Sequence, residues 1–515
     1  MTNQQPVTRP DWHQALFTYF KPKVLVMLFL GFSAGLPLLL IFSSLSIWLR
    51  EAGVARSEVT YFSLAALAFS FKFIWAPLVD KLPIPFLFSI LGRRRSWLLV
   101  AQFAIAASIV SMAMTDPVLG LQGMAFAVVA LGFSAATQDI VIDAYRIEAA
   151  DVDNQAAMSA IYIAGYRIGM VVSGAGSLIL AGKLGIEGEY LYSAWQQTYF
   201  VMAGFTLVGI ITTLIIKEPR AIQSNSKYIH SLQDYARFIF LFFMFTAAFI
   251  VCYLYISELG LNSDLIKFSF LLESLRLIIS LIFSVMVAYG LVLLNIVNGE
   301  MVYSTYIEPF IDFFNRYRNV FVFILLLIGL YRVSDIILGT VANIFYDDLG
   351  FTKEQIGYTS KTFGLIMTIV GGFTGGILSV RFGVLRILLL GGILSAVTNL
   401  LFIYLASTEP DILSLSIVIA ADNLSGGLAM AAFVAYLSGL TSLSFTAMQY
   451  AIFSSLMTLV PKTLSAYSGT IVDMVGYSWF FIGTTLIGVP VIFLILYLIV
   501  KEKTAKNYSN NFTES

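Results

Sequence analysis

Apolar residues occur in long stretches along nearly the whole chain, and short polar segments separate the stretches. About 20 apolar residues are enough to cross a bilayer as a helix, which satisfies its own backbone hydrogen bonds there. The pattern therefore predicts an all-α integral membrane protein. Fourteen spans are expected near residues 24–49, 57–80, 96–115, 118–145, 155–182, 196–216, 237–257, 268–295, 318–346, 353–380, 384–407, 411–440, 443–474 and 476–500.

The predicted spans form two sets of six with one pair between them. We expect a six-helix bundle in residues 1–220, a linker with two extra spans in 221–317, and a second six-helix bundle in 318–515. Two similar halves around a central site are common among membrane transporters. An even number of spans also places both termini on the same side.

Basic residues indicate which side that is. They gather before the first span, between the second and third spans, and at the C-terminal end: Lys21, Lys23, Arg93, Arg94, Arg95, Lys501, Lys503 and Lys506. Short loops rich in lysine and arginine face the cytoplasm, so both termini are predicted to be cytoplasmic.

Composition restricts the function to the membrane. Of the 515 residues, 59% are hydrophobic and 12% are charged, compared with about 25% charged residues in an average soluble domain. No polar stretch is long enough for a separate folded domain, which argues against most enzymes. Lysine plus arginine and aspartate plus glutamate number 30 each, so nucleic acid is not an expected partner. The single cysteine lies in an apolar span and both histidines lie outside the spans, so the usual metal ligands are not grouped. We therefore expect neither a cofactor nor a metal.

The segment QDIVIDAYR (138–146) places two carboxylates at the end of an apolar run. On a helix Asp139 and Asp143 are separated by about 6 Å along the axis and about 40° around it. Repulsion and partial burial both oppose joint ionisation, so one of them is a candidate proton carrier. In the alternative interpretation, Lys72 or Arg146 keeps both carboxylates ionised.

Further charged residues fall within other predicted spans, namely Lys72, Arg167, Arg332, Asp335, Lys361 and Asp422. A charge in the bilayer interior costs several kcal/mol unless it is paired or faces a polar space. These residues therefore either hold helices together in pairs or line a path through the protein. Arg167 and Arg332 are the deepest cations and belong to opposite halves.

Glycine-rich segments recur in both halves: GFSAG (31–35), GYRIG (165–169), GGFTGG (371–376) and NLSGG (423–427). Small residues at this density are typical of surfaces where membrane helices approach closely. We expect packing to be their main role.

Several motifs together resemble a known family. The loop GILSVRFGVLR (376–386) and the longer APLVDKLPIPFLFSILGRRR (76–95) are similar to the loop signature of the major facilitator superfamily, although the first lacks its acid. The chain resembles the AmpG-type muropeptide permeases in GFSAGLPLLL (31–40), FKFIWAPLVD (71–80), GRRRSWLL (92–99), QDIVIDAYR, GYRIGMVVSG (165–174), YIEPFIDFF (306–314), KTFGLIMTIVGGFTGGIL (361–378) and DNLSGGLAMAAFVAYL (422–437). It departs from the family at Asp422, where a glutamate is expected, and over residues 223–300.

The resemblance implies a major facilitator fold with two extra spans between its halves. It also implies a bacterial inner-membrane protein that imports anhydromuropeptides from periplasm to cytoplasm in symport with protons. Such import serves cell-wall recycling and β-lactamase induction. The expected partners are the muropeptide, protons and the bilayer, and the expected state is a monomer.

Three groups of candidate residues follow from these considerations. The proton-coupling candidates are Asp139, Asp143, Asp335 and Asp422. The substrate-binding candidates, which are cations, amides and a tyrosine suited to peptide carboxylates and sugars, are Lys72, Gln138, Tyr166, Arg167, Arg332, Lys361 and Gln449. The gating candidates near the membrane edge are Asp80, Arg93, Arg94, Arg95, Arg146 and Arg381.

Three alternative functions remain open at this point, and one of them is a sensor that does not transport. The chain could carry another anionic amphiphile, such as an acyl-CoA. It could instead be a polytopic membrane transferase, although such enzymes usually present large catalytic loops, and the loops predicted here are short.

The basic loops predict the topology directly. Reporter domains fused after Arg95 and after Lys506 should report the cytoplasm, and one inserted within residues 407–411 should report the periplasm. Alkaline phosphatase and green fluorescent protein fusions measure this. The opposite pattern would invert the assigned orientation.

Overall fold

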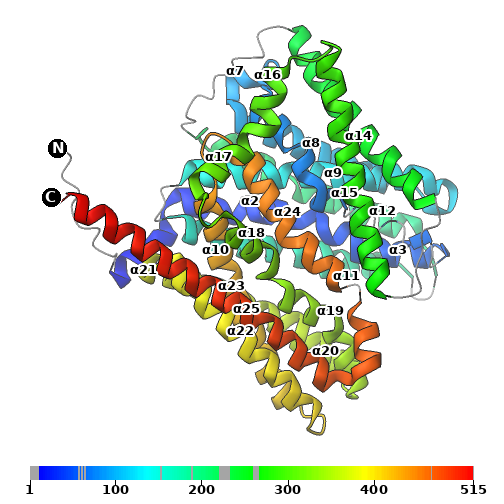
Figure 1. The fold of residues 1–515 in the computed structure, drawn as a ribbon. Coiled ribbons are helices and arrows are strands. Elements are labelled where there is room, and N and C mark those ends of the chain that lie inside the picture. The colour runs from blue at the N-terminus through cyan, green and yellow to red at the C-terminus, as the bar shows by residue number, and fades with distance from the viewer. Residues whose placement is uncertain are drawn as a thin grey trace.

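The computed structural model describes residues 11–55, 58, 59, 62, 65, 67–150, 154–186, 189–219, 232–258, 266–465 and 467–513. Within these residues the protein is helical, apart from one isolated bridge between Ile186 and Glu189. Figure 1 shows the helices arranged in two groups, with a further pair on one flank.

The first group begins with a short N-terminal helix. Its elements are α1 (Trp12–Phe17), η1 (Thr18–Phe20), α2 (Pro22–Leu39), η2 (Leu40–Ser44), α3 (Leu45–Glu51), α5 (Leu67–Phe71), η4 (Lys72–Ile74), α6 (Ala76–Lys81), α7 (Leu87–Leu91), α8 (Arg93–Ala113), α9 (Pro117–Ala149), α10 (Gln155–Val171), η6 (Val172–Gly176), α11 (Ser177–Leu184), α12 (Tyr192–Phe205) and α13 (Leu207–Ile215). These elements are called the first bundle below.

The inserted segment and the second group follow. The insert comprises α14 (Leu232–Glu258), α15 (Ile266–Leu293), α16 (Gly299–Val302), η7 (Tyr303–Ile307) and α17 (Glu308–Tyr317). The second bundle comprises α18 (Phe321–Leu330), α19 (Val333–Asp348), α20 (Lys353–Ile356), η8 (Gly357–Phe363), α21 (Gly364–Phe382), α22 (Val384–Ala406), α23 (Ile412–Leu440), α24 (Thr446–Ser465) and α25 (Ser468–Thr513). Residues 220–231 lie outside the described part of the chain, so the proposed domain boundary at 220 is not tested.

Twelve helices among the described residues are long and apolar enough to cross a membrane. The spans predicted at 57–80 and 443–474 are not among them, so the count of fourteen is not confirmed. The described part of the first is divided among α5, η4 and α6. The second corresponds to α24, which carries Gln449 and Pro461, and to the start of α25, which bends at Gly476 where φ is +79°.

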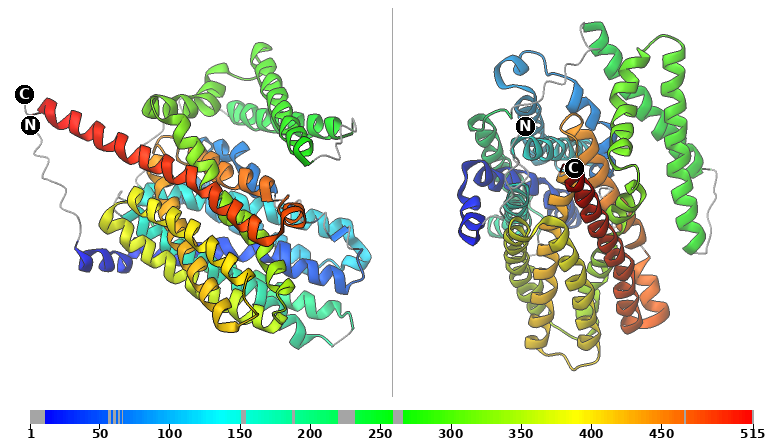
Figure 2. Two further views of the ribbon diagram at one scale, coloured as in Figure 1. Left: turned by 60° about the horizontal axis from the view of Figure 1, so that its bottom comes forward. Right: turned by 60° about the vertical axis from the view of Figure 1, so that its left-hand side comes forward.

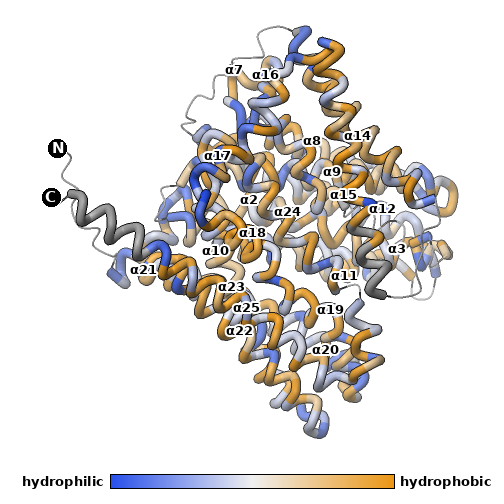
Figure 3. Tube along the Cα trace, in the orientation of Figure 1, coloured by the Kyte–Doolittle hydropathy of each residue, from blue (hydrophilic) through white to orange (hydrophobic). Residues whose placement is uncertain are grey.

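Most of the remaining helices are hydrophobic over their length. Hydrophilic residues gather near the helix ends and along α17, whereas α22 and α25 are mainly apolar (Figure 3). This distribution fits helices whose sides face lipid.

Glycines bring particular helices into direct backbone contact. A Cβ atom added to Gly165 on α10 would lie 2.0 Å from the Leu28 carbonyl oxygen on α2. In the second bundle, a Cβ atom added to Gly427 on α23 would lie 2.1 Å from the Thr368 carbonyl oxygen on α21. These helices approach so closely that a Cβ atom would not fit between them, which supports the expected packing role of the glycine-rich segments.

The two bundles converge at one end. In Figure 1 they meet near α10 and α21 and separate toward α3 and α20. Arg93 to Arg95, at the start of α8, lie on the converging side, which we call the basic end. Hydrogen bonds between the bundles at this end come from Tyr19, which donates to the Phe373 carbonyl at 3.1 Å, and from Asp80 and Arg146, described below.

Neighbouring glycines on α23 test the packing directly. The change Gly427→Ala should destabilise the protein by about 1–3 kcal/mol because the new methyl group meets backbone atoms that cannot move aside. At Gly426, an added Cβ atom meets nothing within 4 Å, so Gly426→Ala should leave stability within about 1 kcal/mol of wild type or raise it. Thermal unfolding of the two purified variants in detergent measures the difference. Equal melting temperatures would contradict the close approach of α21 and α23.

Candidate functional site

A buried arginine organises the charged cluster at the basic end. The side chain of Arg94 is 1% exposed, and its Nη2 atom lies 2.7 Å from Asp80 Oδ1 and in salt-bridge contact with Glu148. Its Nη1 atom donates to the Val79 carbonyl at 3.1 Å. Because a buried cation needs both charge compensation and hydrogen-bond acceptors, this set of partners keeps Arg94 ionised inside the protein.

Asp80 connects the two bundles. Its Oδ1 and Oδ2 atoms accept hydrogen bonds from the backbone N–H groups of Ala447 and Met448, at 3.1 and 2.8 Å. Those groups belong to the first turn of α24, where unpaired N–H groups and the helix dipole favour an anion. A side chain of the first bundle therefore caps a helix of the second bundle.

Neighbouring residues complete this cluster. Arg93 donates to the Asp80 carbonyl at 2.7 Å, and Arg95 donates to the carbonyls of Thr213 and Leu214 at 3.0 and 2.8 Å. Glu218 accepts from the backbone N–H groups of Arg94 and Arg95 at 2.8 and 3.1 Å. Burial raises the pKa of the Glu218 carboxyl, and those two backbone donors lower it, so burial dominates.

A second buried network lies deeper along α9. Arg146 is 0% exposed and donates to Asp143 at 3.2 Å, to Ser159 at 2.9 Å and to Ser438 at 2.7 Å. Its guanidinium also lies 5.2 Å from the centre of the Tyr450 ring. Because Ser438 and Tyr450 belong to α23 and α24, Arg146 joins the first bundle to two helices of the second.

The two neighbouring aspartates of α9 have different surroundings. Asp143 lies between two cations, with its Oδ2 atom 3.6 Å from Lys72 Nζ and its Oδ1 atom in contact with Arg146. Asp139 is 8% exposed, and its buried Oδ1 atom has no hydrogen-bond partner among the described residues. Asp143 therefore has the cation partners that the alternative interpretation requires, whereas Asp139 forms no ion pair with a described residue.

A break in the first span of the second bundle carries another charged pair. α18 ends at Leu330 and α19 begins at Val333, with Arg332 in a non-helical conformation between them. Arg332 Nε lies 3.6 Å from Asp335 Oδ2, and Asp335 also accepts a hydrogen bond from Ser395. Asp335 and Ser395 line a small cavity, with room for about one water molecule.

Arg167 contrasts with the other deep cations because it forms no hydrogen bond or ion pair with any described residue. It lies on α10 and is partly exposed. Arg332, from the opposite bundle, is close enough to repel its charge, and the Tyr166 ring lies beside it. Asp422 is likewise unpaired among the described residues, and it lies near Asp335 and Arg332. Two cations of opposite bundles thus lie near each other.

Two predicted substrate-binding amides are occupied by protein partners. Gln138 is 0% exposed and exchanges hydrogen bonds with the hydroxyl and carbonyl of Ser33, at 2.9 and 3.0 Å. Gln449 is 1% exposed and contacts α17 at the basic end. It lies in the first turn of α24, away from the middle of that helix. These contacts favour roles in helix packing over substrate binding.

The remaining predicted residues lie toward the ends of the second bundle. Lys361 donates to Asn343 at 3.1 Å. Arg381 stacks on Phe382, 5.6 Å from the ring centre, and its buried Nε atom has no hydrogen-bond partner among the described residues. No described carboxylate pairs with Arg381, in contrast to Arg94 in the equivalent loop.

Several partners in these networks were not predicted from the sequence. Glu148, Glu218, Ser438 and Tyr450 all contact the candidate residues. The sequence did contain a signal for Glu148. It is an acidic residue at the end of an apolar helix, where a carboxylate needs a nearby cation. Ser438 and Tyr450 carry no such signal.

Two family models match the chain. The one described as Major Facilitator Superfamily matches residues 324–514, and the one described as Acetyl-coenzyme A transporter 1 matches residues 23–117. The outward conformation of the transporter FucP superposes with a TM-score of 0.61 and 8% identity, over 93% of this chain and 99% of that one. The proton:xylose symporter XylE superposes with a TM-score of 0.53 and 11% identity, over 95% and 96%. At these identities the likeness shows the fold, so the chain is a multi-pass membrane protein with the major facilitator fold.

Relatives of known name extend this assignment. "Putative transporter AmpG 4" of Rickettsia conorii is 32% identical over 92% of this chain and 95% of its own length. "Anhydromuropeptide permease" of Escherichia coli K12 is 30% identical over 94% of this chain and 81% of its own length. The chain belongs to the AmpG-type permease family of the major facilitator superfamily. It is a transporter and not an enzyme, so the transferase alternative is dropped.

Proposed function

We propose that the protein imports anhydromuropeptides across the bacterial inner membrane, from periplasm to cytoplasm, in symport with protons. The basic end would face the cytoplasm, with both termini on that side. The observation that carries the proposal is the pair of deep arginines from opposite bundles, of which Arg167 has no partner in the described protein. The name of the Escherichia coli relative suggests the substrate.

An anhydromuropeptide combines a neutral sugar with peptide carboxylates. A carboxylate bound between Arg167 and Arg332 would relieve the repulsion between them and complete the hydrogen bonding of both guanidinium groups. The Tyr162 and Tyr166 rings, whose centres are 6.1 Å apart, offer apolar faces and hydroxyls beside this point. Sugars suit such surfaces because they present both C–H faces and hydroxyl groups.

The interruption between α18 and α19 supports the same location. Broken membrane helices direct the positive end of a half-helix dipole toward anionic substrate groups. Arg332 stands at the start of α19, so the dipole and the side chain add their positive potentials. The Arg332 guanidinium also contacts the Met430 sulfur at 3.1 Å, which is a weak interaction that a carboxylate would readily replace.

Asp139 is the proposed proton carrier of the first bundle. The Asp139 carboxylate is buried, its Oδ1 atom has no described hydrogen-bond donor and it forms no ion pair with a described cation, all of which favour the neutral form. Asp143 is held between Lys72 and Arg146, so its proposed role is to fix those cations. Asp422 and Asp335, beside Arg332, are the corresponding candidates in the second bundle.

Transport then requires the basic end to open. Opening must separate Asp80 from the first turn of α24 and Arg146 from Ser438, because both contacts join the two bundles. Rigid-body rocking of the bundles is the motion that major facilitator proteins use. Substrate and proton binding near mid-membrane would supply the free energy for this separation.

A second candidate substrate is an acyl-CoA. The match of residues 23–117 to the acetyl-coenzyme A transporter model favours it, and a phosphate-bearing ligand would also suit two adjacent arginines. The relatives named as AmpG transporters cover far more of the chain. Competition of labelled muropeptide by excess acetyl-CoA in proteoliposomes discriminates between the two substrates.

The two arginines should distinguish the peptide of the substrate from its sugar. Arg167→Gln or Arg332→Gln should weaken binding of the peptide-bearing ligand by roughly 10- to 100-fold, the value of one charged hydrogen bond. Binding of the peptide-free anhydrodisaccharide should change little. Calorimetry of both ligands with purified protein measures this, and Lys183→Gln, at an exposed cation of α11, is the matched control. Equal weakening of both ligands would place the arginines in helix pairing.

The two aspartates of α9 should separate coupling from structure. Asp139→Asn should abolish accumulation driven by a proton gradient while counterflow of labelled substrate continues, because the amide imitates the neutral acid. Asp143→Asn should reduce both activities, because it leaves Lys72 and Arg146 without their shared anion. Uptake and counterflow in the same proteoliposomes provide the comparison. If Asp139→Asn lost counterflow as well as gradient-driven uptake, Asp139 would not be the proton carrier.

A further inference from the structure

Helix α17 is attached to the first turn of α24 by a closed set of hydrogen bonds. Gln449 Nε2 donates to the Pro309 carbonyl at 2.8 Å and to Asp312 Oδ2 at 2.9 Å. Its Oε1 atom accepts from Arg316 Nη2 at 2.8 Å and from the Ser442 backbone N–H at 2.8 Å. An amide can form four such bonds, so Gln449 is fully occupied.

Arg316 strengthens the attachment. It pairs with Asp312 at 3.0 Å and donates to the Leu440 carbonyl at 2.9 Å, at the end of α23. The Phe313 ring packs on Phe453 of α24, with ring centres 5.1 Å apart. Charged hydrogen bonds and an aromatic contact therefore fix α17 to the second bundle.

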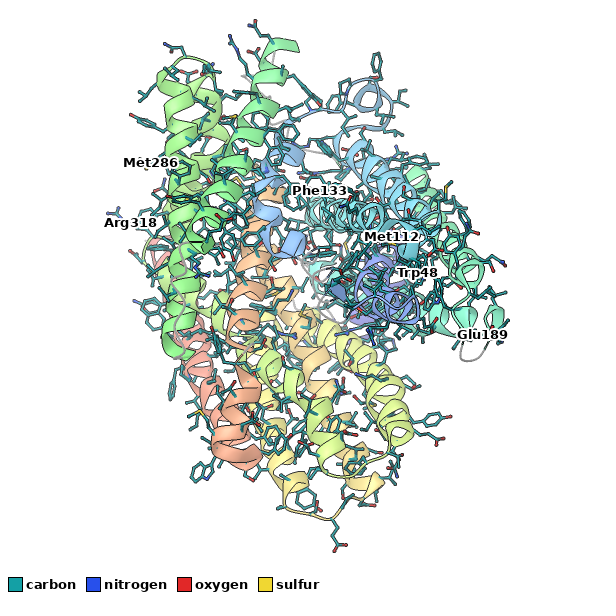
Figure 4. The ribbon with its side chains drawn as sticks, turned by 90° about the vertical axis from the view of Figure 1, so that its right-hand side faces the viewer. Trp48, Met112, Phe133, Glu189, Met286 and Arg318 are labelled. Carbon is teal, nitrogen blue, oxygen red and sulfur yellow. The ribbon has the colours of Figure 1, made fainter. Side chains whose placement is uncertain are left out.

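The other end of the inserted segment is attached to the first bundle. The Tyr306 ring stacks between Phe238 and Phe245 of α14, at centre distances of 6.4 and 6.3 Å. The Phe249 ring of the same helix packs on Phe71 of the first bundle at 5.7 Å. Figures 2 and 4 show α14 and α15 along one flank of the molecule, beside the blue and orange helices, which are the first bundle and α24.

The buried apolar core continues across this boundary. One cluster contains Phe238 and Leu241 of α14, Trp75 and Val79 of the first bundle, and Ala447 of α24. The lipid-facing side of the insert is separate, as Met286 on α15 illustrates by pointing away from the protein (Figure 4). The insert thus contacts both bundles at the place where they converge.

We propose that the inserted segment is a brace for the gate at the basic end, and that Arg316 and Gln449 are its positioning residues. Asp80 caps Ala447 and Met448, and α17 binds Gln449, the very next residue. The first turn of α24 is therefore held directly both by the first bundle and by the insert. Holding this turn in register keeps its N–H groups aimed at Asp80 and stabilises the closed basic end. The proposal rests on the alternating access of the proposed function, but not on the substrate or on proton coupling.

Distance measurements between the bundles test the brace without any substrate. In full-length protein carrying Cys252→Ser, nitroxide labels at Ile90→Cys and Arg386→Cys report the basic end, since both positions are exposed on different bundles. In nanodiscs, Arg316→Gln and Gln449→Leu should each increase the ratio of long to short label distances by about tenfold, the effect of losing one charged hydrogen bond. Arg316→Lys should produce a smaller increase, because lysine keeps the charge but not the fork of donors.

Arg318→Gln is the matched control. Arg318 is the residue directly after the end of α17, and its side chain points away from the bundles (Figure 4). It should leave the distances unchanged. The brace is refuted if Arg316→Gln and Arg316→Lys behave like Arg318→Gln. It is also refuted if Gln449→Leu reduces transport at unchanged distances, which would return Gln449 to the substrate site. Failure of the muropeptide or proton experiments would leave these distance changes unaffected.

Discussion

A charge inside a bilayer has no water to solvate it, and this constraint sorts the charged residues of the transporter into two sets. Arg94, Arg146 and Lys72 meet carboxylates and carbonyl oxygens within the protein. Buried pairs of this kind add little net stability, yet separating one partner from the other is costly. Such pairs therefore suit a lock that holds one conformation. Arg167 and Asp139 form the other set, in which a ligand or a proton can supply what the protein does not.

Both sets depend on where the helices are interrupted. The break at Arg332 places a cation at a helix start, and the start of α24 presents N–H groups to Asp80. A continuous helix would use the N–H groups of α24 internally and could not bind Asp80. Interruptions are tolerated here because they face protein rather than lipid. The interruptions thus produce the contact of Asp80 with α24 and the position at which we propose that the substrate binds.

The first turn of α24 is the point where three parts of the chain meet. Asp80 reaches it from the first bundle, α17 reaches it from the insert, and the turn itself belongs to the second bundle. Hydrogen bonds to backbone groups at such a position can be exchanged as the bundles rock, because water can replace them on the open side. Packing of glycine surfaces within each bundle, as between α21 and α23, is by contrast suited to remain unchanged.

Sequence alone determined the class of the protein. Long apolar stretches, basic loops and glycine spacing are local features, and the bilayer converts them into spans and helix contacts with few alternatives. The sequence also identified most of the charged residues in the networks, because any charge in an apolar span is conspicuous. It did not determine their partners. Asp139 and Asp143 are four residues apart, yet only Asp143 forms ion pairs with described cations. The side-chain amides of Gln138 and Gln449 form hydrogen bonds with residues of other helices. Asp80 binds an N–H group 367 residues away, and only the tertiary structure decides a contact at that separation, because side-chain partners depend on how whole helices are placed and not on spacing within any one of them.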